Sequence, residues 1–140
     1  TQGASLGRDG VRVPLPWQRE GSAFGFASDG VRPWLPQPEA WRELAIELQW
    51  RDPGSTAALY RDAIALRRRL LLPAGPTVRW LDLAEGVLAF RRGSVVVVLN
   101  TSTAEIALPG GVELLRSGGG GGGDPGRLPP DCAVWLLAED

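Results

Sequence analysis

Proline and glycine are concentrated in the first 38 residues of this 140-residue chain, and this feature most restricts what the chain can fold into. Proline fixes φ and lacks the amide hydrogen that helices and sheets use, whereas glycine favours turns. They recur too often for a long helix or strand: Pro14, Pro16, Pro33, Pro36 and Pro38, with Gly3, Gly7, Gly10, Gly21, Gly25 and Gly30. We therefore predict a loop over residues 1–38. A loop of this length is typical of a functional site or of a segment ordered by a partner surface.

One part of this loop, residues 7–17, holds an arginine and a tryptophan on a stiff backbone. Pro14 and Pro16 restrict the residues before them to extended geometry, so Arg12 and Trp17 project with little freedom. A guanidinium offers planar donors to hydroxyl oxygens, and an indole offers an apolar face to a ring. Arg12 and Trp17 are therefore our candidates for binding a hydroxyl-rich ligand. The alternative is that Trp17 is a core side chain and Arg12 its neighbour.

A helix is expected over residues 54–72. Its apolar side chains recur at helical spacing and form one stripe: Leu59, Ala63, Leu66 and Leu70. Asp52 is a suitable N-cap, with Pro53 at the first helical position, and Pro73 with Gly75 ends the helix.

The segment ahead of this helix predicts a short helix over residues 39–44 and then extended chain. Glu39, Glu43 and Glu47 are spaced four residues apart. Since nothing nearby indicates a perturbed carboxylate, we expect them to form a solvated edge.

Residues 76–138 alternate or run apolar in short pieces separated by turn residues, which predicts an antiparallel sandwich. About six strands are expected, at 78–83, 87–90, 95–99, 106–108, 112–115 and 133–137. The strand at 95–99 is apolar on both faces and should be central. Asn100-Thr101-Ser102 matches a glycosylation sequon, yet we interpret it as a strand-ending turn. The fold class is therefore α+β: a loop and one long helix followed by a small β-sandwich.

Composition excludes several classes of function. The net charge of −1 leaves no cationic excess for nucleic acid, and His is absent, which excludes Cys-His and Ser-His dyads and ordinary zinc sites. No stretch approaches a membrane span, and no secretory signal is visible, so we expect a cytoplasmic segment without metal or cofactor. Cys132 is interpreted as a structural thiol. The glycine run 118–123 precedes Asp124-Pro125-Gly126 rather than a helix, which favours a flexible connection over a dinucleotide site.

The order of several motifs resembles a known family. These motifs are Arg12-x-Pro14-x-x-Trp17, Gly25-Phe26, Pro33-Trp34-Leu35-Pro36 and Asp52-Pro53-x-Ser55, followed by Leu59-Tyr60-Arg61-x-Ala63-Ile64-x-Leu66-Arg67. Their sequence and spacing are similar to the C-terminal portion of α-glucosidases of the oligo-1,6-glucosidase type, in glycoside hydrolase family 13. The resemblance runs from about residue 7 to the end.

The resemblance implies a chain that is part of an enzyme. Family members carry a β/α barrel with a small β-sandwich behind it, and 140 residues are too few for a barrel of roughly 250 residues. The family's three catalytic carboxylates would lie upstream, on the missing N-terminal barrel, so no catalytic residue is assigned here and the chain alone is predicted to be inactive. Arg12 and Trp17 would position an α-linked gluco-oligosaccharide.

The implied organisation has three parts: a loop at the rim of the active site (1–38), the terminal barrel helix region (39–75) and the β-sandwich domain (76–140). Trp17, Phe24, Phe26 and Trp34 would be buried against the barrel. A trehalose-forming isomerase of the same family stays open as an alternative. A non-catalytic sugar-binding module is also open, although Trp80, Phe90 and Trp135 fit buried strand positions.

Overall fold

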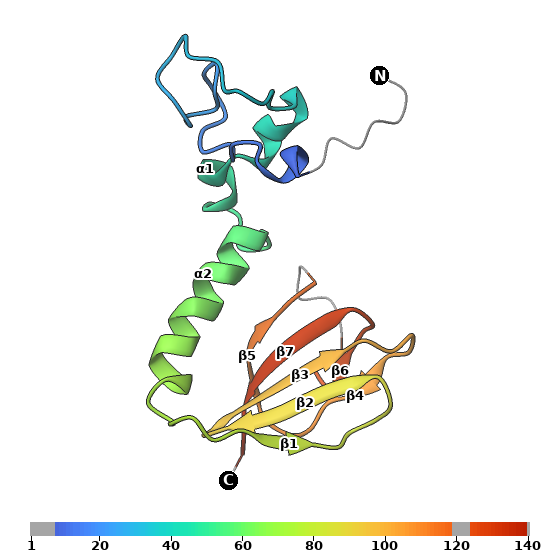
Figure 1. Ribbon diagram of the computed structural model, residues 1–140. Coiled ribbons are helices and arrows are strands. Elements are labelled where there is room, and N and C mark those ends of the chain that lie inside the picture. The colour runs from blue at the N-terminus through green and yellow to red at the C-terminus, as the bar shows by residue number, and fades with distance from the viewer. Residues whose placement is uncertain (1–7, 119–123, 140) are drawn as a thin grey trace. The chain divides into compact units, whose positions relative to one another are not determined.

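The computed structural model describes residues 8–118 and 124–139, and the chain divides into two compact units, residues 1–57 and 58–140. Figure 1 shows the first unit as mostly loop and the second as a helix and a sheet. The glycine run falls mainly on residues 119–123, which lie outside the described residues. The three-part division at residues 38 and 75 stays a prediction. The α+β fold class is confirmed.

Between residues 8 and 55 the structure forms only short helices. Two are 3-10 helices, Asp9–Val11 and Glu39–Leu44, and one is the α-helix α1, Ile46–Gln49. The rest of residues 8–38 is turn and loop, as the proline and glycine pattern predicts. The expected extended chain after residue 44 is wrong, because Ala45 with ψ 136° interrupts the helix for one residue and α1 then continues.

Helix α2 covers Thr56–Leu66 and continues as a π-helical turn, Arg67–Leu71. It therefore matches the predicted helix apart from its start. Asp52 is not the N-cap: its carboxylate accepts a hydrogen bond from the Gly54 amide at 2.9 Å and forms a turn before the helix. Within the predicted stripe, Leu66 is buried, whereas the other three side chains are half-buried.

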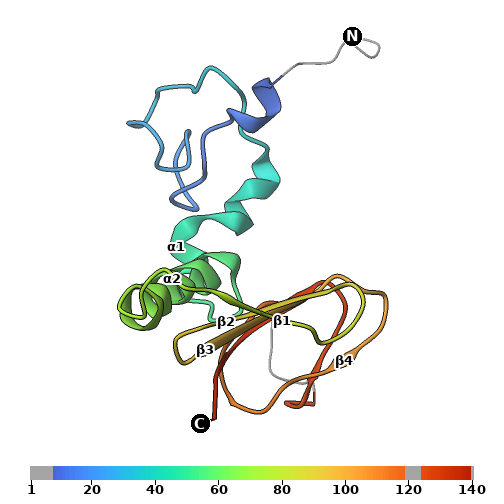
Figure 2. The same cartoon turned by 60° about the horizontal axis from the view of Figure 1, so that its bottom comes forward.

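The second unit contains a five-stranded antiparallel sheet in the order β1-β2-β3-β7-β5 and a two-stranded sheet of β4 and β6. The strands are β1 Arg79–Leu81, β2 Val87–Arg92, β3 Val95–Asn100, β4 Ile106–Ala107, β5 Val112–Arg116, β6 Arg127–Leu128 and β7 Cys132–Leu137. Figure 2 shows the sheet after a turn of the view that brings its lower edge forward. Strand β3 is central, as its two-sided apolar pattern predicts.

The main cluster of buried apolar side chains lies on one face of the large sheet, and Val95 is buried on the other face. The side chains of the main cluster come from β2, β3, β6 and β7: Ala89, Val96, Val98, Leu128, Val134 and Leu136. Burial of these aliphatic groups is the main favourable term for the unit.

Asn100 is the buried polar side chain of this core. Its amide nitrogen donates to the carbonyl oxygens of Ala104 at 2.9 Å and Leu128 at 3.0 Å. Its amide oxygen accepts from the Ser102 amide and from the Ser102 hydroxyl. The interpretation of this segment as a strand-ending turn is therefore confirmed, since all four bonds close the end of β3.

The opposite face of the large sheet carries a row of apolar side chains in register. Trp80 pairs with Phe90, Phe90 with Val97, and Val97 with Trp135. Val97 lies between the core residues Val96 and Val98, so this row points away from the core. Trp80 is 67% exposed and meets the Phe90 ring edge-on at 5.7 Å between centroids. The assignment of Trp80 to a buried strand position is therefore wrong, because β1 is an edge strand.

Candidate functional site

The segment that carries Arg12 and Trp17 is held in place through its backbone carbonyls. The Ile46 amide donates to the Pro16 carbonyl at 3.0 Å, and the Glu47 amide donates to the Trp17 carbonyl at 3.1 Å. Two residues before Pro16, the Pro14 carbonyl accepts from the Gln37 side-chain nitrogen at 3.0 Å. The start of α1 and the Gln37 amide therefore fix this segment, and the two prolines limit how else it can turn.

The predicted site residues both face solvent within this unit. Arg12 is exposed and Trp17 is 49% exposed, so Trp17 is not a core side chain here. The Trp17 amide donates to Phe24 at 2.8 Å, which ties the segment to the turn that follows it. That Arg12 and Trp17 bind substrate stays a prediction.

Phe24 is the anchor of this turn. It is buried to 4% exposure, and its φ of 47° lies in the left-handed region that non-glycine residues rarely occupy. Such a conformation persists only where surrounding contacts hold it. The Arg42 guanidinium supplies one contact, 5.0 Å from the centre of the Phe24 ring.

Arg42 links the 3-10 helix at Glu39–Leu44 to the loop. It forms ion pairs with Glu39 and with Glu20, the latter at 3.1 Å, and it donates to the Arg19 carbonyl at 2.8 Å. The hydrogen bond with Glu39 is the main reason that the pKa of Arg42 is raised, and it outweighs the opposing effect of desolvation. Arg42 therefore stays charged and its donors are engaged by the chain itself.

A second arginine extends this arrangement. Arg19 pairs with Glu43 at 2.8 Å, and its amide donates to the Glu47 carboxylate at 2.6 Å. Glu39 and Glu43 are mostly exposed, as the predicted solvated edge requires, and in addition all three carboxylates accept from an arginine: Glu39 from Arg42, Glu43 from Arg19 and Glu47 from the Arg19 amide. Glu39 pairs with Arg42 three residues away, whereas the partners of Glu43 and Glu47 lie more than twenty residues away, where no local pattern could indicate them.

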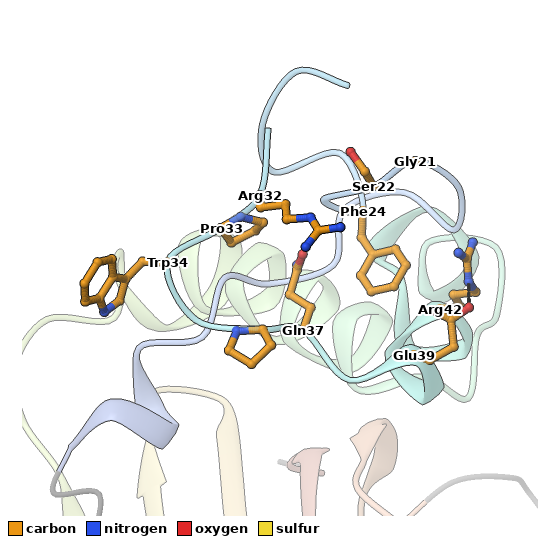
Figure 3. A pocket seen from close by; sticks show the side chains of 10 residues that line it. Gly21, Ser22, Phe24, Arg32, Pro33, Trp34, Gln37, Glu39 and Arg42 are labelled. Carbon is orange, nitrogen blue, oxygen red and sulfur yellow. Dashed lines mark hydrogen bonds and ion pairs between the residues drawn. The ribbon is translucent and has the colours of Figure 1, made fainter. Parts of the chain in front are cut away.

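A pocket of about 470 Å³ opens beside this ion-pair cluster, and Figure 3 shows its side chains. Its polar lining comes from Ser22, Arg32, Gln37, Glu39 and Arg42, and its apolar lining from Phe24, Trp34 and two prolines. Neither Arg12 nor Trp17 lines it. A pocket of this size with a few convergent polar groups suits a small polar ligand. The sequence did not reveal it, because its walls come from separate turns of the loop and from the 3-10 helix Glu39–Leu44.

In residues 8–118 and 124–139, no group of three or more metal-binding side chains lies close enough together to hold an ion. Among the helices seen there, none combines the length and apolar character of a membrane span.

Comparison with known proteins gives a consistent set of relatives. No protein-family model matches the chain. The salivary α-glucosidase of Anopheles gambiae is 34% identical over 107 residues, which are 73% of this chain and 18% of that protein. An oligo-1,6-glucosidase of Saccharomyces cerevisiae is 32% identical over 66 residues, which are 46% of this chain and 11% of that protein. The chain thus spans less than a fifth of these relatives.

Solved structures extend the likeness to the fold. An α-glucosyl transfer enzyme, XgtA, is 32% identical and superposes with a TM-score of 0.63 over 95% of this chain and 26% of its own. A MutB mutant whose crystals were soaked with trehalulose is 24% identical, with a TM-score of 0.67 over 94% of this chain and 26% of that one. The similarity to α-glucosidases of glycoside hydrolase family 13 that the motifs predict is therefore confirmed.

Proposed function

We propose that this chain is the C-terminal part of a retaining α-glucosidase that acts on α-linked gluco-oligosaccharides. The observation that carries the proposal is the similarity to an α-glucosidase across 73% of this chain but only 18% of that relative. A whole enzyme of this kind would contain several hundred further residues. This chain would then supply substrate positioning and structural support.

Retaining glycosidases need two carboxyl groups about 5 Å apart, one as nucleophile and the other as general acid and then base. The carboxylates near the candidate site are engaged otherwise, since Glu20, Glu39 and Glu43 each pair with an arginine. We therefore assign no catalytic residue to the chain. Arg12 and Trp17 would hold the sugar from the rim, and binding energy placed away from the reacting bond can still raise the rate.

The apolar row on the large sheet supports the structural part of this role. Trp80, Phe90, Val97 and Trp135 offer the continuous apolar surface that a neighbouring protein layer covers. The same row also favours a second candidate, a non-catalytic sugar-binding module, because an exposed Trp80 could stack on a sugar ring. We rank it second, since Trp80 is exposed but Phe90, Val97 and Trp135 are already half-buried, which leaves one ring rather than a row of exposed rings for a sugar.

An isomerase or transglycosylase is a variant of the first candidate. It is favoured by the likeness to the α-glucosyl transfer enzyme XgtA at 32% identity. The trehalose-forming isomerase predicted as an alternative would use the same rim residues, so these residues do not separate transfer from hydrolysis.

Incubation of the purified 140-residue chain with p-nitrophenyl α-glucoside and with maltose tests the proposal. We expect no hydrolysis above background, because the nucleophile and the acid would lie upstream. The coding sequence upstream of Thr1 should specify a β/α barrel with the carboxylate pair. Turnover that survives repurification of the 140-residue chain would overturn the proposal.

In the enzyme that includes this upstream region, Arg12→Ala should lower kcat/KM by about 10- to 100-fold, the effect of losing a charged donor to a substrate hydroxyl. Arg51→Ala, at an exposed residue of the same unit, is the control. Unchanged kinetics for Arg12→Ala on a disaccharide would remove Arg12 from the binding site.

A further inference from the structure

The side-chain oxygen of Gln37 is a buried acceptor to which no group in the described residues donates. The other end of the same amide is committed, because Nε2 donates to the Pro14 carbonyl at 3.0 Å. Exchanging the two ends would place the amide oxygen against that carbonyl oxygen, so the orientation of the amide is determined. A buried acceptor of this kind normally has a partner. Gln37 also lines the 470 Å³ pocket, so a ligand bound there is a candidate for the missing donor.

Two arginines line this pocket, and they differ in what they can offer. Arg42 is engaged by Glu39, Glu20 and the Arg19 carbonyl. Arg32 makes no hydrogen bond or ion pair with any described residue, and Figure 3 shows its guanidinium extended toward Gln37. The pocket therefore presents the donors of the Arg32 guanidinium and the acceptor Gln37 Oε1, neither of which has a partner in the described residues.

The remaining walls are rings. Phe24 is fixed under Arg42, while Pro33 and Pro36 give the pocket rigid apolar surfaces. A ligand that accepts from a guanidinium, donates to an amide oxygen and lays an apolar face on rings has the chemistry of a pyranose. A chloride or sulfate ion would not satisfy Gln37 Oε1, because neither has a hydrogen to donate.

We propose that this pocket binds one glucosyl unit of an α-linked oligosaccharide, with Arg32 donating to a hydroxyl oxygen and Gln37 Oε1 accepting from a hydroxyl. This site is separate from Arg12 and Trp17. The choice of an α-linked sugar rests on the proposed function, whereas the hydroxyl-binding chemistry rests on the pocket.

Titration of the 15N-labelled 140-residue chain with isomaltotriose tests the proposal by NMR. The side-chain amide signals of Gln37 and the backbone amides of Gly21 and Ser22 should shift in a saturable way. Arg32→Met and Gln37→Met should each weaken binding by about tenfold, the usual effect of losing one hydrogen bond. Arg51→Met, an exposed arginine outside the pocket, should leave the affinity unchanged.

Gln37→Met also removes the hydrogen bond to the Pro14 carbonyl and could disturb the loop. Arg32→Met tests the site without this effect, because the Arg32 side chain has no partner in the described residues. Cellotriose and sorbitol are the comparison ligands. Preferential shifts with isomaltotriose support the proposal. Equal shifts with cellotriose overturn the preference for α-linked sugar, and an absence of saturable shifts overturns the site, as expected if Gln37 is satisfied by water alone. Neither result depends on the turnover test of the proposed function.

Discussion

The two units of the chain are held together by different forces. Among the described residues of the first unit, the buried apolar side chains are few, Pro16, Ala23, Phe24 and Ala45, and the loop is fixed by ion pairs and backbone hydrogen bonds. In the second unit a set of buried aliphatic side chains lies between the sheets. Exposed ion pairs stabilise by little, whereas burial of a large aliphatic side chain stabilises by about 1.5–3 kcal/mol. The second unit therefore has its own core, whereas the first depends on directional contacts.

The largest expected effect lies in the second unit. Leu128 is fully buried, so Leu128→Ala should lower the free energy of unfolding by about 2–5 kcal/mol, from lost burial and the cavity that remains. Urea unfolding followed by far-UV circular dichroism measures this loss. Leu88→Ala is the matched control, because Leu88 lies on β2 but is 45% exposed. Similar losses for both variants would contradict the placement of Leu128 inside the buried cluster and of Leu88 outside it.

A smaller effect is expected at the polar centre of the same unit. Asn100→Ala removes the donor to the Ala104 and Leu128 carbonyls and should cost about 2 kcal/mol. Asn100→Asp keeps an acceptor for Ser102 but loses both donated bonds, so it should cost at least as much. Urea unfolding of the two variants and of the unsubstituted chain measures these losses in the free energy of unfolding. If Asn100→Asp matched the unsubstituted chain, the donated bonds would be unimportant.

In the first unit the expected effect is local. Arg42→Met should speed amide hydrogen exchange several-fold over residues 18–24, because Glu39, Glu20 and the Arg19 carbonyl lose their common partner. The amides of β3 should be unaffected. Arg116→Met is the matched control, since Arg116 pairs with Glu113 in the second unit. Exchange that changes equally in both units would show that the contacts of Arg42 do not act locally.

The smallest expected effect is that of pH on the contacts of Arg42 with Glu39, Glu20 and the Arg19 carbonyl. The folded-state pKa of Arg42 is raised, so its contribution is fully present below the pKa of the unfolded state and is lost only as the pH rises through the higher folded-state value. Arg42 should therefore cause no change in hydrogen-exchange protection over residues 18–24 between pH 7 and pH 9. Protection factors at the two values check this. A loss of protection between pH 7 and pH 9 that disappears in Arg42→Met would contradict a raised pKa of Arg42.

The sequence predicted the second unit better than the first. Strand positions follow from a period of two residues, and the helix follows from one stripe, because both patterns are local. The pairing of β4 with β6 was not predicted, since each strand is two residues long. The start of α2 was misplaced because the Asp52 carboxylate accepts a hydrogen bond from the Gly54 amide instead of capping the helix, and this depends on the geometry of the turn.

The candidate site was predicted in outline only. Pro14 and Pro16 revealed the stiffness of the segment with Arg12 and Trp17, but not the amides of Ile46 and Glu47 that hold it. Gln37 carried no signal at all, because its role depends on a contact with Pro14, 23 residues away. Loops closed by such long-range polar contacts leave no periodic trace in the sequence.

The buried amide of Asn100 has a consequence for producing this protein in a secretory host. Oligosaccharyltransferase acts on the extended nascent chain, and Asn100-Thr101-Ser102 is an acceptor in that state. The nitrogen it would modify is the one that must donate to Ala104 and Leu128 in the folded unit. Glycan transfer and completion of β3 are therefore mutually exclusive, and any glycosylated product would mark the molecules that failed to fold first.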